Sequence, residues 1–287
     1  MTDKVAKTGE SAQALAQKVR SFTSGLSSIS GGPGVLGIKK NITSAQSGLN
    51  VVFAFDTTGS MYPFFEQVKK SISSMVGDIS QKVKKAKFGL VAWKNHGDES
   101  YFENEKAFLA VGLTENISLI KEAMGKVPKG GGGKDALTCL EDVFHYLNHE
   151  VGWESQAHKI VVLIGDMPPH GVLDPKTKCP FGYDWEKEVA ELQRQDVKIY
   201  SVFCHEEEEL SSRINKVKEF FKGASSTTDG KFLELAEIDD ITDVLVGICL
   251  KLTGHLDDFI EILEARDLLT PSKREILFQL KGGGSNA

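Results

Sequence analysis

From Leu49 onward, short apolar runs alternate with longer stretches whose apolar residues recur at helical spacing. The short runs predict buried strands and the longer stretches predict amphipathic helices. We expect strands at 49–55, 87–93, 106–111, 159–164, 197–203 and 230–234, and helices at 63–81, 115–126, 135–149, 184–195, 207–221 and 238–252. This alternation is typical of a three-layer α/β domain in which helices cover both faces of a mostly parallel sheet.

One connection breaks the alternation. The strands at 87–93 and 106–111 are joined by the polar stretch NHGDESYFEN, which leaves no room for a crossover helix. A connection this short suits an antiparallel pair. We therefore predict a doubly wound, six-stranded sheet with one antiparallel edge strand.

Segments with a different pattern flank this domain. Residues 1–47 carry one amphipathic helical stripe, interrupted by the glycine- and proline-containing stretch SISGGPGVLG. We interpret 1–47 as an N-terminal arm, whose helix either docks on its own domain or binds a partner. Residues 48–253 form the α/β domain, and 254–287 form a helical extension with the flexible tail GGGSNA. Within this extension Pro271 ends one helix, and Ser272–Glu275 is a candidate capping box for the next.

Composition excludes several classes of function. The formal net charge of −6 gives no electrostatic footprint for nucleic acid. No segment approaches the roughly 20 consecutive apolar residues of a membrane span, and the N-terminus lacks the apolar core of a secretory signal. The four cysteines are scattered without a CxxC pair, which favours buried thiols over a disulfide framework. We expect a cytoplasmic protein.

Oxygen-bearing side chains follow two of the predicted strands. Asp56, Thr58 and Ser60 lie two residues apart in DTTGSM, and Asp166 lies in VVLIGDMPPHG. Ligands at the carboxyl ends of parallel strands converge in the crevice where such folds bind ligands. Carboxylate and hydroxyl oxygens suit a hard cation, with magnesium the first choice and manganese or calcium as alternatives. The competing interpretation is a cluster of helix-capping residues.

The Asp-x-Thr-x-Ser pattern after a first apolar strand resembles the metal-ion-dependent adhesion site of von Willebrand factor A domains. The segments VAWKNHGD and VVLIGDMPPHG are most similar to the A domains of alpha-type protein kinases and their bacterial relatives. The resemblance covers about 49–250. It implies that Thr58 and Ser60 bind the metal directly, while Asp56 and Asp166 act through bound waters. It also implies that a partner protein completes the coordination with an acidic side chain.

The middle loop departs from the family pattern, in which a threonine after a Gly-Gly pair is the third direct ligand. Here the loop is KGGGGKDALT, and Gly133 occupies that position. Asp135 is the candidate substitute ligand, or water fills the gap, while Thr138 should lie a turn into the helix. The loop is not a Walker phosphate loop, because Pro128 and Asp135 replace the required glycine and hydroxyl residue.

An enzymatic alternative comes from a second resemblance. DTTGS is also similar to the nucleophile motif of haloacid-dehalogenase-like phosphatases, in which an aspartate attacks phosphorus beside magnesium. That resemblance would make Asp56 the nucleophile. It is weakened by His170, which stands where the family has a second acid, and by the absence of an obvious cap insertion.

Three further residues are candidates for contacting a partner. His96 and His170 lie on loops at the predicted metal face, and Tyr183 lies in a long loop beside it. The alternative for all three is that they brace their loops or pack onto the domain. His145 and His149 share a helix face, but no further cysteine or histidine lies at ligand spacing, so we interpret them as solvated or capping.

The sequence thus predicts a non-catalytic module for divalent-metal-dependent protein binding. The partner could be a separate kinase or ATPase chain, since no kinase domain fits in 287 residues. The alternatives are a magnesium-dependent aspartyl phosphatase, and a scaffold with a vestigial metal site that binds through its terminal helices.

Overall fold

The computed structural model describes residues 48–82, 85–103, 106–129, 131, 137–205, 212–235, 246–248, 250–251, 254 and 256–281. The predicted N-terminal arm, the helix at 238–252 for most of its length, Cys249 and the glycine-rich tail lie outside these residues. The division into arm, domain and extension therefore stays a prediction.

A six-stranded sheet with the order β3-β2-β1-β4-β5-β6 forms the centre of the domain. The strands are β1 (Gly48–Asp56), β2 (Ala86–Trp93), β3 (Phe108–Thr114), β4 (Ala157–Gly165), β5 (Val197–Cys204) and β6 (Lys231–Leu235). All neighbouring pairs are parallel except β2 and β3, which are antiparallel. This confirms the predicted α/β fold with one antiparallel edge strand.

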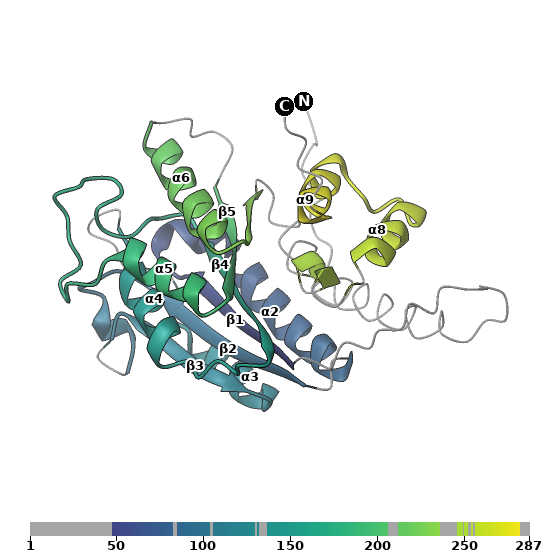
Figure 1. Cartoon of the computed structure of the whole chain (residues 1–287), viewed down its shortest axis with the longest axis horizontal. Helices are drawn as coiled ribbons and strands as arrows, with labels where there is room; N and C mark the ends of the chain where they lie inside the picture. Colours follow the sequence, from purple (N-terminus) through teal and green to yellow (C-terminus); the bar gives the residue numbers. More distant parts are fainter. Residues whose placement is uncertain are drawn as a thin grey trace, which may run out of the picture. The chain divides into compact units, whose positions relative to one another are not determined.

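Helices lie on both faces of the sheet (Figure 1). They are α2 (Tyr62–Lys82), α3 (Ile117–Lys126), α4 (Leu140–His149), α5 (Trp185–Arg194), α6 (Ser212–Thr227), α8 (Leu256–Ala265) and α9 (Pro271–Lys281), with 3-10 turns η2 (Gly59–Met61) and η3 (Glu99–Tyr101). Alternate residues of β1 pack against the helices on opposite faces of the sheet. Val52 and Ala54 belong to the core formed with α4, α5 and α6, whereas the ring of Phe55 lies 6.4 Å from that of Phe65 in α2. A strand buried on both faces needs the continuous apolar run that the sequence provides.

Several element boundaries differ from the prediction. Helix α4 begins at Leu140 rather than near 135, so Thr138 precedes the helix instead of lying a turn into it. Helix α9 begins at Pro271, and its N-cap is Thr270, whose Oγ1 accepts a hydrogen bond from the Lys273 amide at 3.2 Å. The proposed capping box starting at Ser272 is therefore wrong, because a proline fits the first helical position, where no N–H is needed.

The C-terminal helix α9 packs against β6. It buries Ile276, Leu277 and Leu280, and a Cβ atom added to Gly247 would collide with the last two. Within the described ranges, none of the helices is both long and apolar enough to span a membrane.

Candidate metal site

Strands β1 and β4 bring Asp56 and Asp166 to the same edge of the sheet. Phe55 pairs with Ile164, so Asp56 at the end of β1 lies beside Gly165, and Asp166 follows directly. A Cβ atom added to Gly165 would lie 3.2 Å from the Asp56 Cβ. The two carboxyl groups interact electrostatically, as the sequence predicted from their positions at strand ends.

The Asp56 carboxyl group is fully buried. Its Oδ1 accepts a hydrogen bond from the Thr58 amide at 2.7 Å, while Oδ2 has no hydrogen-bond partner among the described residues. Burial, together with the nearby charge of Asp166, raises the pKa of Asp56 from 3.8 to about 8. A buried acid of this kind, with an unsatisfied oxygen beside a second acid, is an environment that a cation would stabilise.

The hydroxyl groups of Thr58 and Ser60 lie 3.3 Å apart. Thr58 is the N-cap residue of η2, yet its side chain makes no capping hydrogen bond. The capping interpretation therefore does not account for the Thr58 hydroxyl. Thr58 is buried and Ser60 is exposed, so the pair lies between the buried acid and solvent.

These donors fit a hard divalent cation. Neighbouring oxygens around octahedral magnesium, bound at 2.0–2.1 Å, lie about 2.9 Å apart, and larger cations need a slightly wider spacing. The hydroxyl pair at 3.3 Å is close to these values. Asp56 and Asp166 supply the negative charge that a divalent ion requires.

Lys94 is a further residue of this site, and the sequence analysis missed it. It follows β2, is fully buried, and donates hydrogen bonds to the carbonyl oxygens of Thr57 at 2.5 Å and Gly131 at 3.1 Å. Burial lowers its pKa, and the charge of Asp56 opposes this shift. The sequence signal for Lys94 was its position directly after the apolar run at residues 90–93, since a lysine there must either reach solvent or find buried partners.

The middle loop is described only in part, and Gly133 and Asp135 lie outside the described residues. Gly131 has a φ of +71°, and a Cβ atom there would collide with Tyr101. Thr138 is bonded to the loop after β4: its amide and its hydroxyl both donate to the carbonyl oxygen of Pro168, at 3.1 and 3.4 Å.

His96 and His170 lie together, with ring centroids 5.3 Å apart, and both contact α4, while His96 also contacts Cys179 and Phe181. Both Nδ1 and the amide of His170 bond to Glu141 Oε1, at 2.9 and 2.7 Å. Nε2 of His96 lies 3.8 Å from Asp142 Oδ1. Tyr183 stacks on His145, with ring centroids 4.0 Å apart. The structure thus brings His96 and His170 together, and it places Tyr183 against α4.

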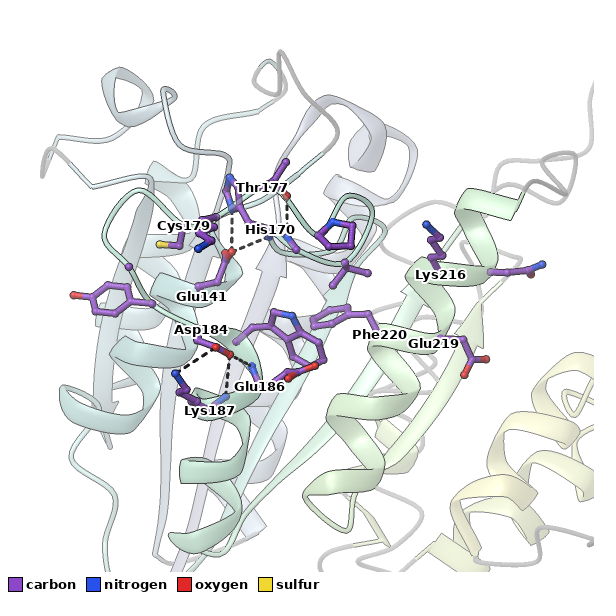
Figure 2. A pocket seen from close by; sticks show the side chains of 18 residues that line it. Glu141, His170, Thr177, Cys179, Asp184, Glu186, Lys187, Lys216, Glu219 and Phe220 are labelled. Carbon is purple, nitrogen blue, oxygen red and sulfur yellow. Dashed lines mark hydrogen bonds and ion pairs between the residues drawn. The ribbon is translucent and has the colours of Figure 1, made fainter.

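A groove of about 840 Å³ lies between the β4–α5 loop, α5 and α6 (Figure 2). His170 and Tyr183 line it, together with Trp185 and Phe220, whose rings pack edge to face. Asp56, Ser60 and Asp166 do not line this groove. The groove and the acid-hydroxyl site are therefore separate features.

Three of the four cysteines are described, namely Cys139, Cys179 and Cys204, and all three are buried free thiols, as predicted. Cys179 lies in the β4–α5 loop and donates to Asp142 Oδ1 at 3.1 Å. Burial and this contact with Asp142 raise the pKa of the Cys179 thiol to about 12.

Comparisons with known proteins agree with this fold. Two solved structures of the pilus adhesin SpaC from Lactobacillus rhamnosus GG, one of them in an open conformation, resemble the chain with TM-scores of 0.54 and 0.50. The identities are 13% and 12%, and each match covers 72% of this chain but only 30% of the adhesin. No curated protein matches the sequence. The family model of the von Willebrand factor type A domain matches residues 50–245. The chain therefore belongs to the von Willebrand factor type A domain family.

Proposed function

We propose that this chain is a non-catalytic protein-binding module whose binding depends on a divalent cation held by Asp56, Thr58, Ser60 and Asp166. The observation that carries the proposal is the Asp56 carboxylate. This group is fully buried, and its Oδ2 has no hydrogen-bond partner within the described part of the chain. The hydroxyls of Thr58 and Ser60, which follow it in the sequence, lie 3.3 Å apart. Burying a carboxyl oxygen without a hydrogen-bond partner costs free energy of folding, and a bound cation would offset that cost.

In the proposed site, Thr58 and Ser60 provide hydroxyl ligands, while Asp56 and Asp166 provide charge through bound water. Magnesium is the expected ion, with manganese or calcium as alternatives, because all of these donors are oxygens. When bound, the ion supplies an electrophilic position that a partner's carboxylate can occupy. Ser60 is exposed, so this position is open to solvent.

The surroundings of the site also suit a protein partner. Tyr62, Tyr101 and Phe181 are among the exposed large apolar side chains, at 59%, 44% and 66% exposure. They belong to α2 after β1, η3 after β2, and the loop after β4, so all three follow strands at their carboxyl ends. Aromatic residues around a central polar contact are typical of protein interfaces.

The partner we propose is a protein that offers an acidic side chain, and a separate kinase or ATPase chain is one candidate. The buried free thiols support a reducing compartment such as the cytoplasm. The phosphatase alternative gains no support from the described residues, because His170 replaces the expected acid and is bonded to Glu141. The terminal-helix alternative is disfavoured for α9, because its apolar residues Ile276, Leu277 and Leu280 are already buried and only Phe278 of that helix is among the exposed large apolar side chains.

The first test is calorimetric titration of the full chain with Mg²⁺ after removal of metal by EDTA. We expect one binding event in the wild type, which Asp56→Ala and Ser60→Ala weaken or abolish. Ser226→Ala is the matched control, because the hydroxyl of this exposed serine donates to the Gly223 carbonyl of its own helix. Equal Mg²⁺ binding by Ser60→Ala and Ser226→Ala would refute the site.

The second test is affinity capture with the wild type and Ser60→Ala, each with Mg²⁺ and with EDTA. We expect a partner that is retained only by the wild type in Mg²⁺. A partner retained equally under all four conditions would refute metal-dependent binding, even if the ion itself binds.

A further inference from the structure

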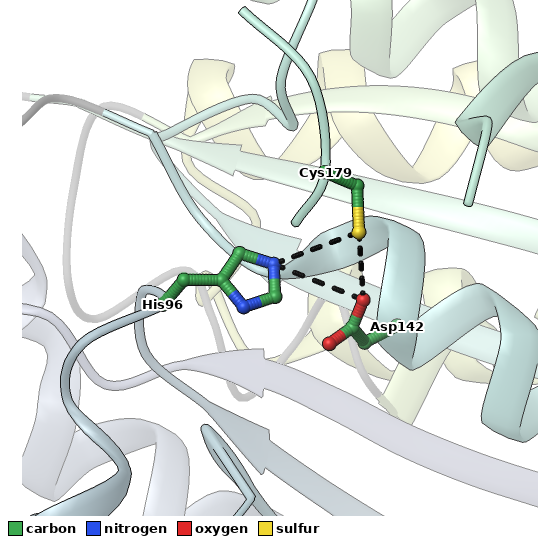
Figure 3. A group of neighbouring side chains, drawn as sticks. All are labelled: His96, Asp142 and Cys179. Carbon is green, nitrogen blue, oxygen red and sulfur yellow. Dashed lines mark hydrogen bonds and ion pairs between the residues drawn. The ribbon is translucent and has the colours of Figure 1, made fainter. Parts of the chain in front are cut away.

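A second group of possible metal ligands lies at the start of α4. Nε2 of His96, Oδ1 of Asp142 and Sγ of Cys179 converge (Figure 3). The distances are 3.8 Å from Nε2 to Oδ1, 3.8 Å from Nε2 to Sγ, and 3.1 Å from Sγ to Oδ1. The three residues come from separate segments, namely the loop after β2, the first turn of α4, and the β4–α5 loop.

These distances suit a tetrahedral ion. Zinc binds sulfur at about 2.3 Å and nitrogen or oxygen at about 2.0–2.2 Å, so the ligand atoms around it lie roughly 3.3–3.8 Å apart. A set of one thiolate, one imidazole and one carboxylate also suits zinc by its chemistry. Magnesium, in contrast, takes oxygen ligands in octahedral geometry, so this group differs in kind from the site at Asp56.

Glu141 and His170 form an adjacent group with His96, and they are the candidates for a fourth ligand. The ligand atoms of these three residues lie within 4.8 Å of one another. The Glu141 side chain is only 2% exposed, and its Oε2 has no hydrogen-bond partner in the described chain. Buried polar atoms without partners are rare in native proteins, and an unseen ion is one explanation for them.

The side chains of the cluster are largely buried, although Glu141, His170 and Cys179 also line the groove. The side chains of His96, Asp142 and His170 are each 10% exposed, and Cys179 is buried. Structural zinc sites are closed, with all four positions filled by protein, whereas catalytic sites keep one position open to water or substrate. The burial therefore favours a structural role.

We propose that His96, Asp142 and Cys179, with a fourth ligand from Glu141 or His170, form a structural zinc site that fastens the β4–α5 loop to α4. Zn²⁺ replaces the proton of the Cys179 thiol, which is released to solvent, and no redox change takes place. The β4–α5 loop begins at Asp166 and lines the groove. Zinc would therefore fix the conformation of a loop that contributes both to the Asp56–Asp166 site and to the groove.

The test is titration of the metal-free full chain with Co²⁺ in excess Mg²⁺, so that the hard-ion site does not compete. The wild type should bind one Co²⁺ per chain with a thiolate-to-metal charge-transfer band and the visible bands of tetrahedral cobalt, and Zn²⁺ should abolish both. Cys179→Ser should lose the charge-transfer band and bind roughly 100-fold more weakly or worse. His96→Ala should lose the tetrahedral spectrum.

His149→Ala is the matched control. His149 belongs to a separate and more exposed candidate group with His145 and Glu188, so this variant should keep the wild-type cobalt spectrum. Circular dichroism of each variant checks folding, and the wild-type spectrum tests the proposal even if a variant fails to fold. The absence of a tetrahedral thiolate spectrum in the wild type, or its persistence in Cys179→Ser, would overturn the proposal.

Discussion

Lys94 donates a hydrogen bond to the backbone carbonyl of Thr57 at 2.5 Å, immediately after the buried carboxylate of Asp56. The same ammonium group bonds to Gly131 and lies 4.8 Å from the ring centroid of Tyr101. One buried charge thus connects the end of β1, the glycine loop and η3. Because it is positive, it opposes the rise in the Asp56 pKa that burial and Asp166 cause.

We expect Lys94→Met to destabilise the metal-free protein by about 2–4 kcal/mol, because the substitution leaves the buried Thr57 carbonyl and the more exposed Gly131 carbonyl without this donor and removes a charge beside a buried acid. Urea unfolding in EDTA measures the change. Lys187→Met is the control, since the Lys187 side chain is 84% exposed and should change stability by no more than about 0.5 kcal/mol. Equal effects of the two substitutions would contradict the structural role of Lys94.

Asp56 should make the metal-free protein less stable as pH rises. Its pKa is about 8 in the folded state against an ordinary value of 3.8, so between these values the unfolded chain has released a proton that the folded chain keeps. The free energy of unfolding therefore decreases as the pH rises to about 8, and this contribution is constant at higher pH. Asp56→Asn should remove this slope.

Thermal unfolding from pH 5 to 9 in EDTA checks this prediction, with Asp56→Asn more stable than the wild type at the alkaline end. Magnesium should reverse the order, because it stabilises only the protein that binds it, by about 2.7 kcal/mol at 100 times its dissociation constant. A wild type and Asp56→Asn with the same pH dependence in EDTA would contradict the assignment.

The fold and the two halves of the site were predictable from local sequence. Strands β1 and β4 each contain a continuous apolar run, and Asp56 and Asp166 lie at the carboxyl ends of these runs, so parallel pairing alone brings them together. Helix starts were less predictable, because tertiary hydrogen bonds decide them. The amides of Thr138 and Cys139 donate to Pro168 and Lys94, at 3.1 Å each, and this holds the chain outside α4 until Leu140.

The cluster of His96, Asp142 and Cys179 was not predictable from spacing. Its members lie 46 and 37 residues apart along the chain and meet only because three loops converge over α4. Similarly, α6 continues to Thr227, past the predicted end at 221, because Ser225 hydrogen bonds to Ser201 in β5. In both cases the structure depends on contacts between segments that are distant in the sequence, and a local sequence pattern does not predict such contacts.

Asp184 should contribute measurably to stability as the N-cap of α5. Its Oδ1 accepts hydrogen bonds from the amides of Glu186 at 3.1 Å and Lys187 at 3.3 Å. We expect Asp184→Ala to lower the free energy of unfolding by about 1 kcal/mol, and Asp184→Asn to retain most of it, because asparagine also caps helices well. Urea unfolding compares the two, and an asparagine variant as unstable as the alanine variant would argue against capping.

Gly165 should control the position of Asp56. An alanine Cβ at 165 would lie 3.2 Å from the Asp56 Cβ, 3.4 Å from the Trp93 ring and 3.5 Å from the Phe221 ring. The first of these atoms is fixed to the backbone of a central strand, so it cannot move without moving β1. We expect Gly165→Ala to destabilise the protein by about 1–3 kcal/mol through overpacking, and to weaken Mg²⁺ binding as well.

Gly223→Ala separates this steric effect from the general effect of replacing glycine. Gly223 lies in α6 with nothing within 4 Å of an added Cβ, so alanine there should leave Mg²⁺ binding unchanged and stabilise the helix by up to about 1 kcal/mol. Calorimetric Mg²⁺ titration and urea unfolding of both variants test the pair. If Gly165→Ala bound Mg²⁺ as tightly as Gly223→Ala, the ion would not depend on the position of Asp56, and the site would have to be placed elsewhere.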